Sequence, residues 1–192
     1  MINNNDFVKR QKYAFCHRPD CFSCQQHMPT HCHNRTTLGI VNRDGAFAEY
    51  LTLPIENLYV VPESVSDEEA VFVEPLAANF EMLGQVHLKP TESVVILGDG
   101  KMGQLAAQVL TLSGFEMRMM GKHEEKLALA EKCGVRTYVL DDAQSFTLEN
   151  RSHVDMVVEC LGSAQALEMA LRLVRPRGTI ILKNTLTFFH EV

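Results

Sequence analysis

The amino-acid sequence predicts an α/β protein whose larger part is a doubly wound parallel sheet. In the second half of the chain, short segments that are apolar throughout alternate with segments whose apolar residues recur at helical spacing. These short segments lack the in–out alternation of a half-exposed strand, so we expect both of their faces to be covered. The first of them, at 94–97, turns directly into a helical segment through Gly98-x-Gly100-x-x-Gly103.

Two strands and two helices are expected before this alternation begins. Ser66 precedes Glu69 at the capping-box spacing, so a helix should start directly after Ser66. Pro75 cannot lie inside a regular helix and is expected to open the next one. The expected elements are strands at 46–53 and 58–61, a helix from about residue 67 and a helix at 76–86. Residues 1–15 are polar, without a clear period, and are expected to be a poorly ordered lead-in.

The second half is expected to hold five parallel strands joined by right-handed crossovers. The strands are expected at 93–97, 115–120, 136–140, 154–159 and 179–183, and the helices at about 101–113, 124–133 and 163–174. Residues 141–152 fit either a short helix or a loop. If the sheet ends at 179–183, this last, apolar strand lies at an edge, so self-association into a homo-oligomer or poor solubility is expected.

The glycine-rich turn predicts a dinucleotide-binding site. Gly98 allows the tight turn, Gly100 lets the backbone approach a pyrophosphate, and Gly103 lets helix and strand pack closely. Free N–H groups at the start of the helix, which begins with Lys101 and Met102, would bind the phosphates. The alternative is an ordinary strand–helix turn that binds nothing.

The end of the second strand of the sheet bears on the choice between NADP and NAD. An NAD site usually has Asp or Glu there, about 20 residues after the glycines, to bind the ribose hydroxyls. This chain has Gly121, Lys122 and His123 instead. Without a carboxylate a 2′-phosphate is not repelled, and Lys122 or His123 could attract it, so NADP is favoured over NAD. The alternative is that Lys122 is a solvated turn residue and that either coenzyme binds.

Four of the six cysteines lie within 17 residues and predict a metal site: Cys16, Cys21, Cys24 and Cys32. Four thiolates on a short loop can enclose Zn²⁺ tetrahedrally, and a loop with no core of its own is ordered by the metal. A site closed by four protein ligands is structural, because a catalytic zinc needs an open position. The alternative is a group of free thiols, because the spacing between the first two cysteines is irregular.

Composition excludes several classes of protein. Charged residues (22%) and hydrophobic residues (46%) are at globular averages, which argues against disorder. The net charge of −6 argues against a nucleic-acid partner, which requires a basic face. No apolar run approaches the roughly 18 residues that span a membrane, and the first residues lack the features of a signal peptide. We therefore expect a soluble, cytoplasmic protein without nucleic-acid or membrane partners.

Several motifs follow one another in a specific order. They are Cys32-His33-Asn34-Arg35-Thr36-Thr37-Leu38-Gly39-Ile40, Asp44-Gly45-Ala46-Phe47-Ala48-Glu49-Tyr50, Glu74-Pro75-Leu76-Ala77, the glycine turn, and Val157-Val158-Glu159-Cys160-Leu161-Gly162. In this order and at these distances they resemble the zinc-dependent alcohol dehydrogenases of the medium-chain dehydrogenase/reductase family, in particular its polyol- and threonine-dehydrogenase-like members. The resemblance runs from about Cys16 to Lys183.

The resemblance implies a structural zinc in the cysteine loop. Cys21, Cys24 and Cys32 match the last three ligands of that site in the family. The first ligand would fall at Arg18, two residues after Cys16. Either Cys16 loops back to complete the site, or the zinc is weakened or lost.

The resemblance also implies a catalytic zinc and a coenzyme site. At a helix entrance, Glu74 is by itself typical of a partner for the helix dipole. It matches, however, a glutamate that the family places at the catalytic zinc, directly or through water. Cys160 and Gly162 match the loop beneath the nicotinamide ring. The expected coenzyme-binding residues are Gly98, Gly100, Lys101, Met102, Gly103, Gly121, Lys122, His123, Cys160 and Gly162.

By this resemblance the chain is an oxidoreductase in which zinc polarises a small alcohol or polyol and hydride passes to NADP or NAD. Residues 1–86 are expected to be part of a mostly β GroES-like domain with the structural zinc loop at 16–32. Residues 87–192 are expected to be part of an NAD(P)-binding Rossmann domain. Because family members have further catalytic-zinc ligands and a sixth sheet strand, we expect a truncated member, weakly active or inactive. The alternative is a non-catalytic NADP-binding module or pseudoenzyme.

Overall fold

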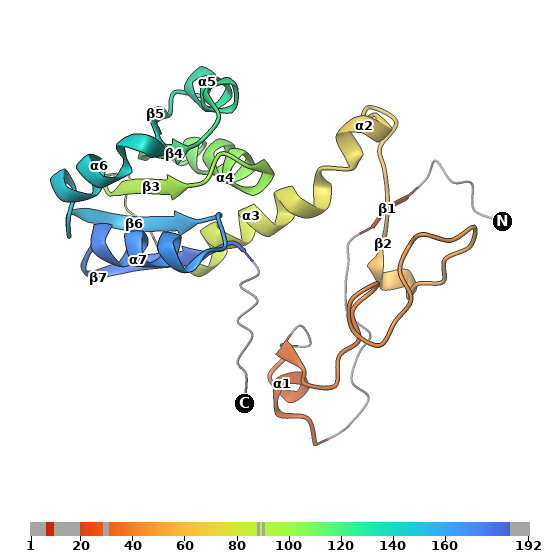
Figure 1. The fold of residues 1–192 in the computed structure, drawn as a ribbon. Coiled ribbons are helices and arrows are strands. Elements are labelled where there is room, and N and C mark those ends of the chain that lie inside the picture. The colour runs from red at the N-terminus through yellow and green to blue at the C-terminus, as the bar shows by residue number, and fades with distance from the viewer. Residues whose placement is uncertain (1–6, 10–19, 29–30, 88, 90, 185–192) are drawn as a thin grey trace. The chain divides into compact units, whose positions relative to one another are not determined.

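The computed structural model describes residues 7–9, 20–28, 31–87, 89 and 91–184, and the chain divides into two compact units (Figure 1). The boundary falls between Glu74 and Pro75, inside the first turn of helix α3 (Val73–Gln85). The boundary expected from the sequence, residue 86, lies at the other end of that helix.

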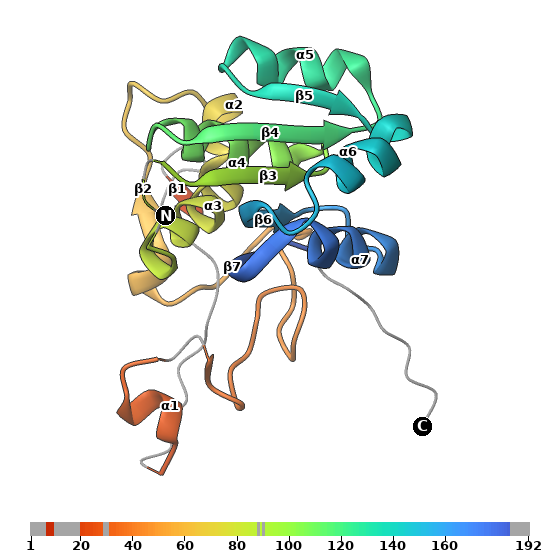
Figure 2. The same cartoon turned by 90° about the vertical axis from the view of Figure 1, so that its left-hand side faces the viewer.

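The larger unit is built on a five-stranded parallel sheet with the strand order β5-β4-β3-β6-β7 (Figure 2). The chain runs outward from the central β3 to β5, then returns to the other side of β3. The carboxyl ends of β3 and β6 therefore form the switch point of a doubly wound sheet, where such folds bind ligands. The strands are β3 (Ser93–Leu97), β4 (Glu116–Gly121), β5 (Arg136–Val139), β6 (Val154–Glu159) and β7 (Val174–Leu182). The helices that follow α3 are α4 (Lys101–Thr111), α5 (Glu124–Lys132), α6 (Ala143–Glu149) and α7 (Ala164–Leu173), with a 3₁₀ turn at Leu140–Asp142.

Two apolar clusters cover the two faces of this sheet. Val94 and Ile96 of β3 pack with α3, α4 and α5, whereas Val95 and Leu97 pack with α6 and α7. All four side chains are fully buried, which explains why the strand is apolar at every position. Within the described ranges, no helix combines the length and the apolar character that a membrane span requires.

The predicted α/β class with a parallel sheet is confirmed, and the predicted strands and helices of this unit agree with the observed ones in type and order. The segment 141–152, left open between helix and loop, contains α6. The last strand begins at Val174 instead of residue 179. Pro176 and the positive φ of Arg177 (62°) interrupt the strand pattern there, and the pairing with β6 shifts register at the same place.

The described residues of the smaller unit have little regular structure. Its elements are β1 (Phe7–Lys9), α1 (Phe22–Gln25), a 3₁₀ turn (Ile55–Asn57), β2 (Leu58–Val60) and α2 (Asp67–Ala70). Strands β1 and β2 pair in antiparallel fashion. The predicted capping box is confirmed: Ser66 Oγ accepts a hydrogen bond from the Glu69 N–H at 3.3 Å, and a Glu69 carboxylate oxygen accepts one from the Ser66 N–H at 2.9 Å.

Three predictions for this part of the chain are wrong. Residues 46–53 form no strand; no described strand pairs with them, and the apolar side chains of Phe47 and Tyr50 are exposed, so the alternation has no core to face. Helix α3 begins at Val73, before Pro75, because a proline in the first turn lacks only an N–H that would have no helical partner. Residues 7–9, placed in an unordered lead-in, form β1.

Gly103 is the point of closest packing between α4 and β3. A Cβ atom added there would lie 1.9 Å from the carbonyl oxygen of Gly98. We expect Gly103→Ala to lower the free energy of unfolding by about 1–3 kcal/mol, because helix and turn must separate. Urea unfolding measures this. Gly84→Ala, in α3 with no atom within 4 Å of the added Cβ, is the control and should be neutral or stabilising. Equal losses in both variants would contradict this interpretation.

Asp155 joins three strands near the amino end of the sheet. One carboxylate oxygen accepts hydrogen bonds from the N–H and hydroxyl of Ser93 at 2.8 and 3.0 Å. The other accepts one from Nε of Arg175 at 2.6 Å. The hydrogen bonds from Arg175 and Ser93 lower the pKa of Asp155. The carboxylate form therefore stabilises the folded state.

We expect Asp155→Asn to lower the free energy of unfolding by about 1–3 kcal/mol near pH 7, because an amide NH₂ would face one of these donors. A carboxyl whose folded pKa is depressed stabilises above its unfolded pKa, and this contribution is lost as the pH falls through the folded value. The difference between wild type and variant should therefore shrink in urea unfolding at about pH 3. A difference of the same size at both pH values would argue against this role.

Candidate functional site

The glycine turn connects β3 to α4 with each glycine in a different environment. Gly98 has φ +117°, a value that favours glycine, and its N–H donates to the Met120 carbonyl at 2.8 Å. Gly103 packs against the Gly98 carbonyl, as described above. Gly100 is different, because an added Cβ would meet no atom within 4 Å. The turn therefore leaves open space above Gly100, at the entrance of the helix.

The amino end of α4 is available to an anion. Gly100 is its N-cap residue, and no side chain caps the helix. The backbone N–H groups of the first turn, beginning at Lys101 and Met102, lack partners within the helix. An uncapped helix N-terminus beside an open glycine is the arrangement that binds a phosphate group.

A carboxylate from the glycine turn holds the end of the neighbouring strand, β4. Asp99 Oδ2 accepts hydrogen bonds from the backbone N–H groups of Lys122 and His123 at 2.8 and 2.7 Å, and lies 3.0 Å from His123 Nδ1. Burial raises the pKa of Asp99, but the hydrogen bonds from His123 and Lys122 outweigh it and the net pKa is lowered. Sequence reasoning missed Asp99, although the acid between two glycines and the lone Gly121 at the end of the next strand were visible signals.

The loop after β6 is held by a second buried carboxylate. Glu159 is fully buried, and its Oε1 accepts hydrogen bonds from the N–H groups of Leu161 and Gly162 at 2.6 and 2.9 Å, while its Oε2 accepts one from the Asn184 amide. Burial first, and then the charge of Glu159, raise the pKa of Cys160 to about 12. Cys160 is therefore a neutral thiol near pH 7. Sequence reasoning did not assign Glu159 a role, because it reads as the last residue of a strand.

Helix α3 contributes polar groups near the start of α4. Asn79 is fully buried, and its amide nitrogen donates to the Pro75 carbonyl at 2.8 Å and lies 4.0 Å from the Met102 sulfur. Its Oδ1 has no hydrogen-bond partner within the part of the chain that the structure describes. Lys183 donates from Nζ to the Ala78 carbonyl. A buried oxygen without a partner is costly unless a ligand or water satisfies it.

The predicted coenzyme residues therefore lie at the carboxyl ends of three adjacent strands. Gly98 to Gly103 follow β3, Gly121 to His123 end β4 and follow it, and Cys160 to Gly162 follow β6. Glu74, the expected catalytic-zinc ligand, is the second residue of α3 and is half-buried.

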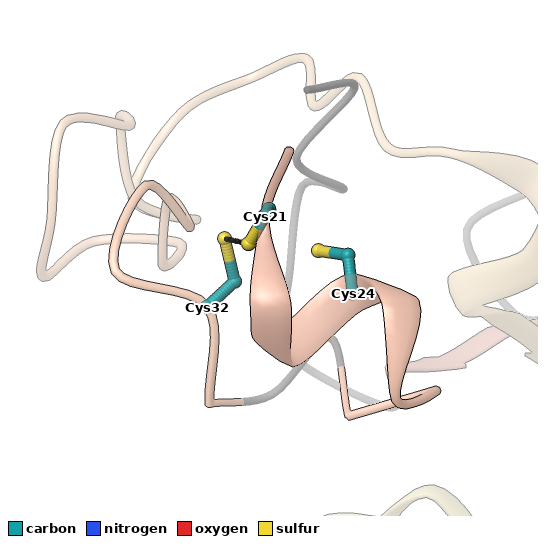
Figure 3. Close-up of side chains that lie close together, drawn as sticks. All are labelled: Cys21, Cys24 and Cys32. Carbon is teal, nitrogen blue, oxygen red and sulfur yellow. Dashed lines mark hydrogen bonds between the residues drawn. The ribbon is translucent and has the colours of Figure 1, made fainter. Parts of the chain in front are cut away.

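Three of the four predicted zinc ligands lie together in the smaller unit (Figure 3). The sulfur atoms of Cys21, Cys24 and Cys32 lie within 4.8 Å of one another, and those of Cys21 and Cys32 are 3.6 Å apart. Cys21 is the N-cap of α1, Cys24 lies inside that helix, and Cys32 is fully buried. The fourth expected ligand, Cys16, lies outside the described residues.

The chemistry of these thiols suits a cation. Desolvation, followed by hydrogen bonds and charge repulsion from Cys21 and Cys32, raises the pKa of Cys24 to about 12. The backbone N–H of Asn34 donates to the Cys32 sulfur at 3.3 Å, a contact that supports a thiolate. Three converging sulfurs fit a Zn²⁺ ion, which prefers tetrahedral thiolate coordination and requires one more ligand.

Comparison with known proteins gives consistent matches. A family model described as "Zinc-binding dehydrogenase" matches residues 102–183. The chain is 30% identical over 190 residues to an L-threonine 3-dehydrogenase of Pyrococcus horikoshii, covering 94% of this chain and 53% of that protein. It is 29% identical over 174 residues to a sorbitol dehydrogenase of Halalkalibacterium halodurans, covering 86% and 50%. The chain thus spans about half the length of the curated relatives it matches.

Solved structures with the same fold include two relatives above 25% identity. A candidate zinc-binding dehydrogenase from Sinorhizobium meliloti, bound to NADP, superposes with a TM-score of 0.81 at 27% identity and covers 97% of this chain and 56% of its own. An alcohol dehydrogenase from Thermus sp. ATN1 superposes with a TM-score of 0.80 at 27% identity and covers 96% and 58%.

Zinc binding by the three thiols is directly testable. We expect the metal-free chain to take up one Zn²⁺ with a rise in melting temperature, and Cys24→Ser or Cys32→Ser to lose most of the bound metal. Because zinc binds thiolates and the pKa of Cys24 is raised, binding should release protons and strengthen as the pH rises. Metal content after dialysis measures this. Cys133→Ser, a thiol in the sheet unit, is the matched control; metal retained by all three variants would exclude the site.

Proposed function

This chain belongs to the medium-chain, zinc-dependent alcohol dehydrogenase family, and from this premise we propose that it takes part in the NAD(P)-dependent oxidation of a small alcohol or polyol. The observation that carries the proposal is the open space above Gly100 beside the uncapped start of α4. A coenzyme pyrophosphate needs both of these features.

The nicotinamide end of the coenzyme would lie along the ends of β3 and β6. There Glu159 accepts hydrogen bonds from the loop 160–162 and holds the loop backbone in one conformation beside the nicotinamide ring. Cys160 is neutral and adds no charge next to a ring whose own charge changes in the reaction. Asn79 Oδ1, which has no hydrogen-bond partner among the described residues, supports a polar ligand group beside Asn79. When bound, the coenzyme accepts the hydride; these residues orient it and exclude water.

We propose NADP as the preferred coenzyme. Lys122 and His123 are exposed where β4 ends, so the Lys122 ammonium group and the His123 ring can meet a 2′-phosphate. The Sinorhizobium meliloti relative is bound to NADP, which supports the same choice. The names of the matched relatives mention different substrates, including threonine and sorbitol. We therefore propose the substrate class and no single compound.

We propose that zinc has two positions in this family member. Cys21, Cys24 and Cys32, with Cys16 as the fourth ligand, would hold a structural ion. Glu74 would bind a catalytic ion, which polarises the alcohol oxygen when present. Catalytic zinc sites use three protein ligands, and Glu74 supplies one. We therefore propose slow turnover or none by residues 1–192 alone, as a coenzyme-binding module.

Gly100→Ala separates coenzyme binding from folding. Its φ of −72° suits alanine, and the added Cβ meets no protein atom, so the melting temperature should not change. The methyl group would, however, occupy the space of the pyrophosphate, and we expect binding of NADPH and NADH to weaken about tenfold or more. Titration of the reduced coenzymes by fluorescence measures this, with Gly84→Ala as the control.

An activity assay of the same purified wild-type chain tests whether it turns over substrate. Coenzyme binding without measurable oxidation of threonine, sorbitol or simple alcohols supports the module. Sustained zinc-dependent turnover would contradict the proposed lack of activity and leave the family function in place. A wild-type chain that binds neither coenzyme would overturn the proposed function itself.

A further inference from the structure

We propose that Asp99 is a positioning residue that makes the site prefer NADP over NAD, an inference that rests on the proposed coenzyme-binding function. It lies in the glycine turn, between Gly98 and Gly100, whereas the residues expected to meet a 2′-phosphate follow the next strand. Asp99 would act through those residues and not by touching the coenzyme.

Three hydrogen-bonding interactions converge on one oxygen of Asp99. Oδ2 accepts from the N–H groups of Lys122 and His123 at 2.8 and 2.7 Å, and the His123 ring nitrogen Nδ1 lies 3.0 Å from it. This single atom fixes the backbone of both residues and the ring of one. The fixed ring has its other nitrogen on the side away from Asp99, where it can meet a phosphate oxygen when protonated.

The residue at the end of β4 has to be glycine for this arrangement. A Cβ added at Gly121 would lie 2.5 Å from Cβ of Asp99 and 2.6 Å from its Oδ2. Asp99 therefore occupies the space in which a side chain at the end of the strand would begin. An acidic residue at position 121 and Asp99 in its present place exclude each other.

The burial of Asp99, compared with the exposure of Lys122 and His123, supports a preference for NADP. Asp99 is 6% exposed, whereas the side chain of His123 is 48% exposed and Lys122 is exposed. The negative charge thus lies beneath the surface and is compensated by N–H groups, while the side chains of Lys122 and His123 face outward. Nearby acidic side chains in the sequence, Glu124 and Glu125, lie in the first turn of α5. A 2′-phosphate would therefore meet the side chain of Lys122, whose backbone is fixed by Asp99, and the ring of His123, which Asp99 also contacts.

The competing interpretation assigns Asp99 the opposite effect. If its carboxylate bound the ribose hydroxyls directly, it would repel a 2′-phosphate and favour NAD, as an acid at the strand end does. The two interpretations predict opposite changes in NADPH affinity when the charge of Asp99 is removed. Removal of the charge should weaken NADPH binding in the first case, and should weaken NADH and strengthen NADPH binding in the second.

The test compares Asp99→Asn with the wild type in the full 192-residue chain. We expect the dissociation constant for NADPH to rise about five- to tenfold, because charge-assisted hydrogen bonds become neutral ones. The constant for NADH should change less than about twofold. In competition titrations, Asp99→Asn should weaken binding of adenosine 2′,5′-bisphosphate and leave that of adenosine 5′-phosphate nearly unchanged. This result would show that Asp99 acts at the adenosine end of the coenzyme.

Two further variants test the proposal at the cationic side of the site, and a third is the control. Lys122→Met and His123→Gln should each lower the preference for NADPH, and His123→Gln should have little further effect in the Asp99→Asn background. Glu149→Gln removes an exposed carboxylate at the end of α6 and should leave both constants unchanged. The melting temperature of each variant is measured alongside.

Each outcome decides the question. Equal weakening of NADPH and NADH by Asp99→Asn would show a merely structural role and overturn the proposal. Stronger NADPH binding would assign Asp99 to the ribose hydroxyls and also overturn it. If the wild type binds neither coenzyme, the proposed function fails and this inference fails with it. If the wild type binds both equally, this inference and the proposed preference for NADP are lost, while the proposed coenzyme-binding function stands.

Discussion

The contact between Gly103 and the carbonyl of Gly98 sets the geometry on which the rest of the sheet unit depends. No side chain fits between them, since an added Cβ would lie 1.9 Å from the oxygen. Helix α4 can therefore start directly at the end of β3, at the switch point of the sheet. The uncapped N–H groups and the open side of Gly100 follow from that placement.

Two buried carboxylates perform the same structural task at neighbouring strand ends. Asp99 binds the N–H groups after β4, and Glu159 binds those after β6. Loops at such positions usually lack backbone partners, and a side-chain acceptor gives them a fixed shape. In both cases the negative charge is kept away from solvent, which leaves the backbone and the cationic side chains as the surface that a ligand meets. The two carboxylates therefore fix the loops of the site without exposing negative charge to a ligand.

The fold of the sheet unit could be predicted because its pattern is local. The apolar run 94–97, the glycine spacing and the helical periodicity each specify a nearby structure, and their order specifies the topology. Asp99 was missed because its partners, the N–H groups of Lys122 and His123, lie on the next strand end, and the signals at Asp99 and Gly121 have meaning only when that contact is known. Glu159 was missed because it reads as the last residue of an apolar strand, although its N–H partners at Leu161 and Gly162 are local. In the smaller unit, the alternation at 46–53 predicted a strand that is absent, since Phe47 and Tyr50 have no core to face. In that unit the grouping of three thiols could be predicted, because a metal site is specified by the type and spacing of its ligands more than by packing.

The closeness of these thiols also has a redox consequence. The sulfurs of Cys21 and Cys32 are 3.6 Å apart, so small displacements would suffice for an oxidant to join them. Such a bond would withdraw two of the three converging donors. Zinc binding by Cys21, Cys24 and Cys32 would therefore require that these thiols stay reduced.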